Sequence, residues 1–317
     1  MNRCLSLAGA FLTVVALSTG ASLAETARYT GLCEASAAAM VDENHFAVAS
    51  DDSEKLRIYR TDLAEPLSFD FEQRGVTDIE GAARIGNTIF WVTSHSLSKT
   101  GNDSAKRKVL FATEISRGPS LIAAGDPYTD LRKDIADALG IPEEKIKATL
   151  NIEGAASSPA GSLLLALRAP LEGSAPGRAY IIEIDNPFEL IGGGSGKRAK
   201  VVKVHKLKLF DDGEAKGRGI RSIERAGSRY IIVAGNVEDS AEPVRLYSWD
   251  GKSDDGLNPI SGGDIGGLVP EALIAWSASD IQILGDNGGV IIDGKECDDE
   301  HGQPPGAWFP SDRFPSP

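Results

Sequence analysis

A charged residue followed fifteen positions later by a second polar residue recurs along this chain, and this repeat constrains the fold most. Each pair flanks a short apolar segment, a turn rich in Gly, Asn, Ser or Asp, and an apolar run of β-forming residues, as in a β-hairpin. A looser fifth copy begins at Glu34 and reaches Asp51 after seventeen residues. Repetition at intervals of tens of residues indicates a repeat architecture. The four regular pairs are Glu80 and His95, Glu153 and Arg168, Arg221 and Asn236, and Glu271 and Asp286.

The spacing between the copies indicates which architecture it is. Successive copies start 46, 73, 68 and 50 residues apart. The shorter intervals match the roughly 40–50 residues of a four-stranded propeller blade, whereas the longer ones need insertions or an additional, degenerate blade. We therefore predict an all-β chain, a single β-propeller domain over residues 25–300, with five blades and with six as the alternative.

One insertion, at residues 126–150, has a helical pattern. Apolar residues recur at helical spacing over residues 131–139, and Thr129 or Asp130 precedes them as a candidate cap. Gly140 follows as a candidate helix end, and a second short helix is predicted directly after it. We expect a short helical insertion within the propeller.

The two ends of the chain differ from the repeats. Arg3 precedes an apolar run at residues 5–17 and then small residues, an order typical of a secretory signal peptide over residues 1–24. The run is shorter than the about 20 residues of a spanning helix. We expect an exported protein, periplasmic or secreted, without membrane insertion. Five prolines in the last seventeen residues favour an extended or disordered tail over residues 301–317.

The chain is acidic, with 46 Asp and Glu against 33 Lys and Arg and a formal net charge of −13. This balance argues against nucleic acid and against anionic membrane surfaces as partners, because both attract Lys and Arg. It is compatible with cationic ligands or divalent metals, and equally with acidity that serves only solubility. We expect a monomer whose partner is a small polar molecule or a metal.

Two cysteines, Cys33 and Cys297, lie outside the predicted signal peptide. In an oxidising compartment an even pair indicates a disulfide, and no CxxC pair is present to suggest a metal or redox motif. Such a bond would close a loop of 264 residues and restrict the unfolded chain by roughly 4–5 kcal/mol in the loop-entropy model. Two unrelated buried thiols remain the alternative.

The repeat also predicts a site. A hairpin returns to the end from which it started, so the two residues of each pair are expected at one end of a blade. If these hairpins are the innermost strands, all five pairs collect around one mouth of the central channel. The set has six carboxylates, two Arg, one His and one Asn: Glu34, Asp51, Glu80, His95, Glu153, Arg168, Arg221, Asn236, Glu271 and Asp286.

Several interpretations of this set are open. In one interpretation, the polar residues at strand ends have a purely structural role: they hydrogen-bond neighbouring backbone and hold adjacent blades together. Ca²⁺ or another divalent metal would relieve the acid excess. Two Arg are able to hold an anion, and paired carboxylates are able to act as acid and base. The candidate assignments are Glu34, Asp51, Glu271 and Asp286 for metal, Arg168, Arg221 and Asn236 for ligand binding, and Glu80, Glu153 and, as proton shuttle, His95 for catalysis.

Six segments of the chain resemble a known family. Together they resemble a bacterial exported family known as domain of unknown function 3616, over residues 31–286. The resemblance implies a β-propeller-like fold near the phytase-like and esterase-like propellers, and it implies no established activity. The segments are 31–36, 78–82, 93–96, 151–155, 165–171 and 218–224.

Three functions follow as hypotheses. The leading one is binding of a small polar ligand or divalent metal at the channel mouth. The first alternative is a hydrolase of a phosphoester or sugar-like substrate at the same mouth. The second is an interaction scaffold that works through the insertion at residues 126–150.

Overall fold

The computed structural model describes residues 27–67, 70–238, 244–260, 268–298 and 303–314. The predicted signal peptide, residues 1–24, lies outside the described residues. Within the described part of the chain, no helix is both long enough and apolar enough to cross a membrane.

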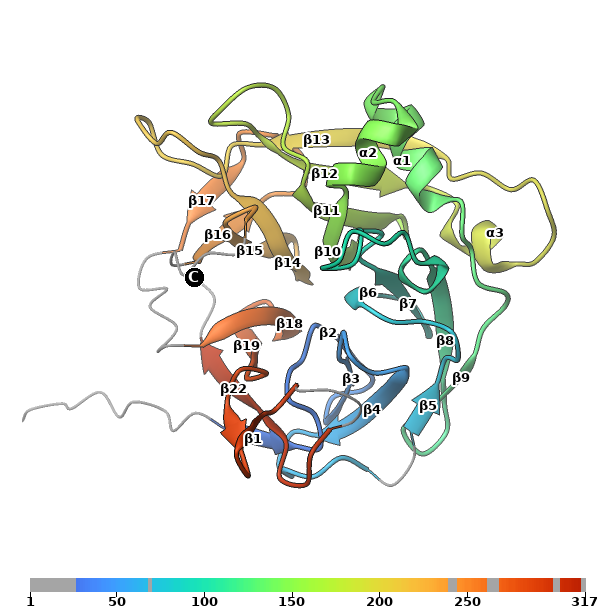
Figure 1. The fold of residues 1–317 in the computed structure, drawn as a ribbon, viewed down its shortest axis with the longest axis vertical. Coiled ribbons are helices and arrows are strands. Elements are labelled where there is room, and N and C mark those ends of the chain that lie inside the picture. The colour runs from blue at the N-terminus through green and yellow to red at the C-terminus, as the bar shows by residue number, and fades with distance from the viewer. Residues whose placement is uncertain (1–26, 68–69, 239–243, 261–267, 299–302, 315–317) are drawn as a thin grey trace, which may run out of the picture.

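Five antiparallel sheets of four strands each surround a central channel (Figure 1). This arrangement confirms the prediction of a β-propeller, with five blades rather than six. The first blade consists of β2 (Ala37–Met40), β3 (His45–Ala49), β4 (Lys55–Arg60) and β5 (Asp70–Glu72), and the second of β6 (Ile79–Ile85), β7 (Thr88–Thr93), β8 (Leu110–Ser116) and β9 (Ser120–Ala123). The third blade consists of β10 (Asn151–Ser157), β11 (Leu163–Ala169), β12 (Ala179–Ile184) and β13 (Val201–Leu207). The fourth consists of β14 (Gly219–Ala226), β15 (Arg229–Gly235), β16 (Arg245–Trp249) and β17 (Leu257–Pro259).

The fifth blade joins the two ends of the chain. Its strands are β18 (Val269–Ser277), β19 (Asp280–Asp286), β22 (Trp308–Phe314) and, at the outer edge, β1 (Ala27–Thr30). A separate two-stranded sheet, β20 (Ile291–Ile292) with β21 (Lys295–Glu296), lies between β19 and β22 in the sequence. Because the first strand pairs with the last, the ring is closed by backbone hydrogen bonds.

The prediction of an extended or disordered tail over residues 301–317 is therefore wrong for β22. This strand lies between β1 and β19, and Phe309 and Ser311 within it are buried. The Phe309 ring stacks on Tyr29 at 5.4 Å and meets Tyr59 edge-on at 5.3 Å. Proline lacks an amide donor, so the prolines around and within β22 concealed a strand that is fixed by its aromatic packing. The propeller domain extends to the end of β22.

The predicted disulfide is present between Cys33 and Cys297, whose Cα atoms lie 5.6 Å apart. Cys33 lies between β1 and β2, and Cys297 follows β21, so the bond joins the start of the first blade to the long β19–β22 connection. A disulfide is typical of an oxidising compartment.

The predicted helical insertion forms α1 (Leu131–Leu139) and α2 (Glu143–Thr149). Asp130 is the residue at the N-cap, and Gly140 ends α1 with a φ of 63°, a conformation that glycine adopts without steric cost. Leu131 and Ile146 are buried in one apolar cluster with strands of the second and third blades. The helices thus extend the core between these blades. The short helices α3 (Pro187–Ile191) and η1 (Ala105–Arg107) were not expected.

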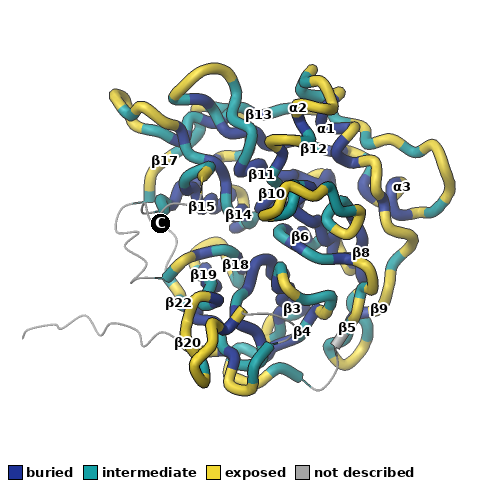
Figure 2. Tube along the Cα trace, in the orientation of Figure 1, coloured by how far each residue is buried: buried dark blue, intermediate teal, exposed yellow. Residues whose placement is uncertain are grey.

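Burial follows the strands. Figure 2 shows buried residues along the blades and exposed residues mainly on the connecting loops. Most of the core consists of apolar clusters that form where neighbouring blades face each other, as between the first and second blades around Trp91 and Leu56. This packing fixes the innermost strands around the channel and so positions the residues at their ends.

Candidate functional site

A β-bulge occurs at the same place in the innermost strand of four blades. Cross-strand pairing passes from Ile79 directly to Gly81, so Glu80 is the extra, unpaired residue of β6. A bulge bends its strand and re-aims the side chain of the extra residue. The equivalent extra residues are Glu153 in β10, Arg221 in β14 and Glu271 in β18. The charged residue that opens each regular repeat is therefore a bulge residue.

Small residues follow these bulges because neighbouring blades come very close there. A Cβ atom added to Gly81 would lie 2.8 Å from Val92 Cγ1 and 3.0 Å from the backbone of Gly154 and Ala155 in the next blade. A Cβ on Gly154, in the third blade, would lie 3.1 Å from Ile223 Cγ2 of the fourth blade. The Glu-Gly dipeptides thus combine an inward-facing charge with backbone-to-backbone packing.

The bulge residues line a cavity of about 560 Å³ at one mouth of the channel. Eight of the ten predicted residues contribute to its wall, which confirms most of the predicted convergence. They are Glu34, Asp51, Glu80, Glu153, Arg168, Arg221, Glu271 and Asp286.

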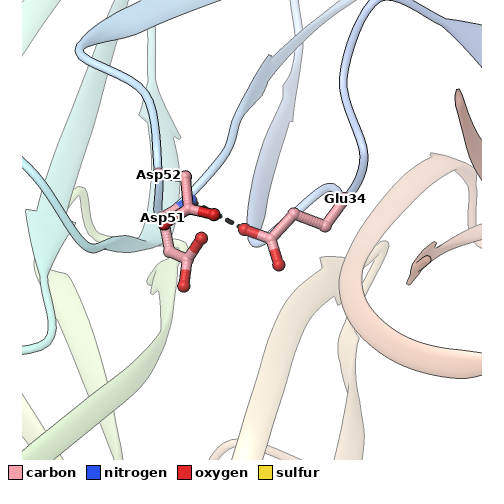
Figure 3. Close-up of side chains that lie close together, drawn as sticks. All are labelled: Glu34, Asp51 and Asp52. Atoms are coloured by element: carbon pink, nitrogen blue, oxygen red, sulfur yellow. Dashed lines mark hydrogen bonds between the residues drawn. The ribbon is translucent and has the colours of Figure 1, made fainter. Parts of the chain in front are cut away.

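A group of carboxylates centred on Asp51 lies at this cavity, and all of them except the exposed Asp52 line its wall. Oxygen atoms of Asp51, Asp78 and Glu80 lie within 4.8 Å of one another, and so do oxygen atoms of Glu34, Asp51 and Asp52. Figure 3 shows the second of these groups, in which the backbone N–H of Asp51 donates to Glu34 Oε1 at 3.0 Å. We call these five residues the acidic cluster.

Ion pairs form another part of the cavity wall. Arg168 donates through Nη1 to Glu153 Oε1 at 2.8 Å and through Nε to the backbone oxygen of Asn236 at 3.0 Å. Arg221 donates to Glu271 Oε1 at 2.5 Å, which joins the fourth and fifth blades. These contacts support the structural interpretation for this part of the set, because each of these Arg side chains fastens neighbouring strands or blades.

Three buried oxygen atoms in the cavity wall have no hydrogen-bond partner among the described residues. They are Asp51 Oδ1, Asn151 Oδ1 and Glu153 Oε2. All three are acceptors. Two are carboxylate oxygens, and the third is the amide oxygen of Asn151, whose amide nitrogen donates to Glu153 Oε1 at 2.8 Å. Buried polar atoms in folded proteins are nearly always satisfied. The cavity therefore requires donors or cations that the described chain does not supply.

Burial in the cavity raises the pKa of several carboxyls. Desolvation first, and neighbouring acids second, hold the pKa values of Glu34 and Glu80 well above the ordinary range. Desolvation raises the pKa of Asp78 to about 6, although Arg107 and Ser94 oppose the shift, and that of Asp52 to about 6. These shifts reflect desolvation first and crowded negative charge second.

The same effect reaches the ion-paired side. Desolvation raises the pKa of Glu271 to about 8 even though Arg221 opposes the shift, and it also raises the pKa of Asp286. Arg221 therefore offsets only part of the desolvation free energy of placing the Glu271 carboxylate in the cavity.

The placement of His95 at the channel mouth is wrong. β7 ends at Thr93, and the chain turns at His95 with a φ of 59°, which buries the ring completely. Its Nδ1 atom lies 2.9 Å from the backbone oxygen of Thr93, and burial lowers its pKa to about 4. His95 is absent from the cavity wall, so it does not fit the role of proton shuttle there.

Asn236 also lies apart from the main cavity. It follows β15 and lines a neighbouring cavity of about 280 Å³, which shares Val237 and Glu238 with the main one. Its backbone oxygen, which holds Arg168, contributes to the site only indirectly.

Several cavity residues were not predicted. Asp78 and Asn151 each stand two positions before a bulge Glu, and this recurrence within the repeat was a usable signal. Arg107 comes from the polar loop between β7 and β8 and forms an ion pair with Asp78 at 2.5 Å. Nothing in the composition of that loop distinguishes Arg107 from its neighbours Lys106 and Lys108.

The comparisons with known proteins bear on the fold. No protein-family model and no curated protein matches the chain. The crystal structure of the major Malassezia sympodialis allergen Mala s 1 is similar, with 9% sequence identity, a TM-score of 0.54 and coverage of 90% of this chain and 93% of that one. The PQQ-bound aldose sugar dehydrogenase from Streptomyces coelicolor has 13% identity, a TM-score of 0.43 and coverage of 92% and 99%.

At such identities the similarity extends to the fold alone. The five-bladed propeller is established by the sheets of the structure itself. The propeller fold implied by the resemblance to domain of unknown function 3616 is thus confirmed, whereas no family model supports that family.

Proposed function

We propose that this propeller binds a divalent cation of the Ca²⁺ class at the acidic cluster. Asp51 is the central ligand, with Asp78 and Glu80 on one side of it and Glu34 and Asp52 on the other. The observation that carries the proposal is made at Asp51: its buried Oδ1 has no partner among the described residues, and its carboxylate lies within 4.8 Å of carboxylate oxygens from both neighbouring groups. Ca²⁺ takes six to eight oxygen ligands from carboxylates, carbonyls and water.

The charge of the cavity supports the same function. Nine carboxylates and four basic side chains line it. Arg168 and Arg221 already pair with Glu153 and Glu271, so the acidic cluster has only Arg107, on Asp78, as a paired cation among the described residues. A divalent cation would relieve this repulsion, and its binding would couple to the folded state.

Calorimetry on chelator-stripped protein tests the proposal. Titration with Ca²⁺ is expected to show one site, and Asp51→Asn is expected to weaken binding by about tenfold or more, because it removes a charged ligand and keeps the side-chain shape. Ca²⁺ at 100 times its dissociation constant is expected to stabilise the wild type by about 2.7 kcal/mol in thermal or chemical unfolding.

Asp62→Asn is the matched control. Asp62 is an exposed carboxylate that pairs with Arg60 and is not part of the cavity wall, so its substitution is expected to leave Ca²⁺ affinity unchanged. Equal Ca²⁺ affinity in wild type and Asp51→Asn, or no Ca²⁺ binding by the wild type, would remove the cation site.

No comparable observation favours the two alternatives. A hydrolase at this mouth would keep Glu80 and Glu153 as acid and base, but His95 lies buried outside the cavity. The apolar side of the insertion at residues 126–150 contributes Leu131, Ile135 and Ile146 to the core. The disulfide supports a site that works in an oxidising, exported compartment.

A further inference from the structure

The third blade, next to the blade that carries Asp78 and Glu80, has two acceptors without a hydrogen-bond partner among the described residues. Glu153 is only 5% exposed, and its Oε2 atom has no hydrogen-bond partner among the described residues, nor does Asn151 Oδ1. Both side chains are held in place: Asn151 donates to Glu153 Oε1 at 2.8 Å, and Arg168 donates to the same atom at 2.8 Å. The unpartnered oxygens therefore belong to fixed side chains of two residues that line the cavity.

The cavity is larger than a cation requires. Its volume is about 560 Å³, whereas a water molecule occupies about 30 Å³ in the liquid, and ligand pockets commonly measure about 300–1,000 Å³. A cation with several coordinated oxygens would leave room for a molecule of roughly monosaccharide size.

The charges in the wall restrict the class of that molecule. Nine carboxylates against four basic side chains disfavour an anion, particularly because Arg168 and Arg221 already pair with Glu153 and Glu271. A cationic ligand would be repelled by the divalent cation bound in the same cavity. A neutral molecule rich in O–H donors satisfies both conditions.

We infer that the cavity binds a neutral polyhydroxylated molecule of monosaccharide size beside the cation. Hydroxyl groups of this ligand donate to Glu153 Oε2 and Asn151 Oδ1, and other hydroxyl oxygens complete the coordination of the cation. The inference rests on the proposed cation site and adds a second subsite at Asn151 and Glu153 of the third blade.

Calorimetry with four small probes tests the ligand class. D-glucose and myo-inositol are neutral, glucosamine carries an ammonium group and glucose 6-phosphate carries a phosphate. At least one neutral probe is expected to bind the Ca²⁺-loaded protein with a dissociation constant of about 1 mM or tighter, and to lose about tenfold or more in affinity when the Ca²⁺ is chelated.

Variants of Asn151 locate the second subsite. Asn151→Ala removes one fixed acceptor and is expected to weaken binding of the neutral probe by about tenfold, and to weaken Ca²⁺ binding less. Asn151→Asp keeps an acceptor oxygen and is expected to bind the neutral probe more tightly than Asn151→Ala. Asn258→Ala, at an exposed position of the outer strand β17, is the matched control and is expected to change neither affinity.

The outcomes separate the inference from the function on which it rests. If Ca²⁺ binds and no neutral probe does, the inference fails and the cation site stands. If glucosamine or glucose 6-phosphate binds more tightly than glucose, the inferred ligand class is wrong. If Ca²⁺ itself does not bind, the proposed function fails first, and the inference fails with it.

Discussion

The four bulge residues are chemically different because their partners differ. Glu153 pairs with Arg168 of its own blade, and Arg221 pairs with Glu271 of the next blade. Glu80 is surrounded instead by other acids, of which Asp78 has the largest effect on its pKa and Glu153 the next. The replacement of Glu by Arg at position 221 thus supplies a counter-ion for Glu271, and the unbalanced charge is concentrated near Glu80.

This charge predicts how Ca²⁺ affinity depends on pH. Metal ligands bind as carboxylates, so protons compete with the cation. Because the pKa values of Asp52 and Asp78 are raised to about 6, and those of Glu34 and Glu80 are also raised well above their ordinary range, affinity is expected to fall as the pH decreases through about 6. Calorimetric titrations from about pH 5 to about pH 8, in two buffers of different ionisation enthalpy, measure the affinity and the protons released.

The cation-free protein is expected to show the opposite trend. The carboxyls with raised pKa values bind more protons in the folded state than in the unfolded state, so their contribution to stability decreases as the pH rises from about 4 through the folded pKa values. Lys99, near Asp52, and Arg107, on Asp78, moderate the trend. A Ca²⁺ affinity that stays constant over the same pH range would contradict the assignment of these carboxylates as ligands.

At the scale of the element, the repeat predicted the inner hairpins, and the cap and Gly140 predicted α1. The bulges were not predicted, since a fifteen-residue spacing fits hairpins with and without an extra residue. The burial of His95 was missed for a related reason. Its position follows the repeat, but a local turn of the backbone decides which way its ring points.

The close approach behind each bulge predicts the effect of Gly81→Ala. The added Cβ would meet the backbone of Gly154 and Ala155 at 3.0 Å and Val92 Cγ1 at 2.8 Å, so neighbouring strands must shift. The free energy of unfolding is expected to fall by about 1–3 kcal/mol in urea denaturation. Gly289→Ala is the control, because a Cβ at Gly289 would meet nothing within 4 Å. Equal stability of the two variants would show that the blades do not pack this closely.

At the scale of the whole molecule, the elements that close the ring lie next to acidic residues of the cavity. β1 pairs with β22, and the disulfide joins Cys33 to Cys297. Each cysteine is followed directly by a cavity acid, Glu34 and Asp298 respectively. The cysteine pair could be predicted from the sequence because only two cysteines lie outside the predicted signal peptide. The strand β22 could not, because its prolines argue against a strand with neighbours on both sides.

The proposed function requires a divalent cation in the cavity, held by Asp51. Crystals of the chelator-stripped protein soaked in Mn²⁺, a divalent cation that prefers oxygen ligands, test it directly by anomalous diffraction. We expect an anomalous peak in the cavity between Asp51, Asp78 and Glu80, or between Asp51, Glu34 and Asp52, and no such peak in crystals of Asp51→Asn. An empty cavity in the wild type, or a peak that persists unchanged in Asp51→Asn, would contradict the account.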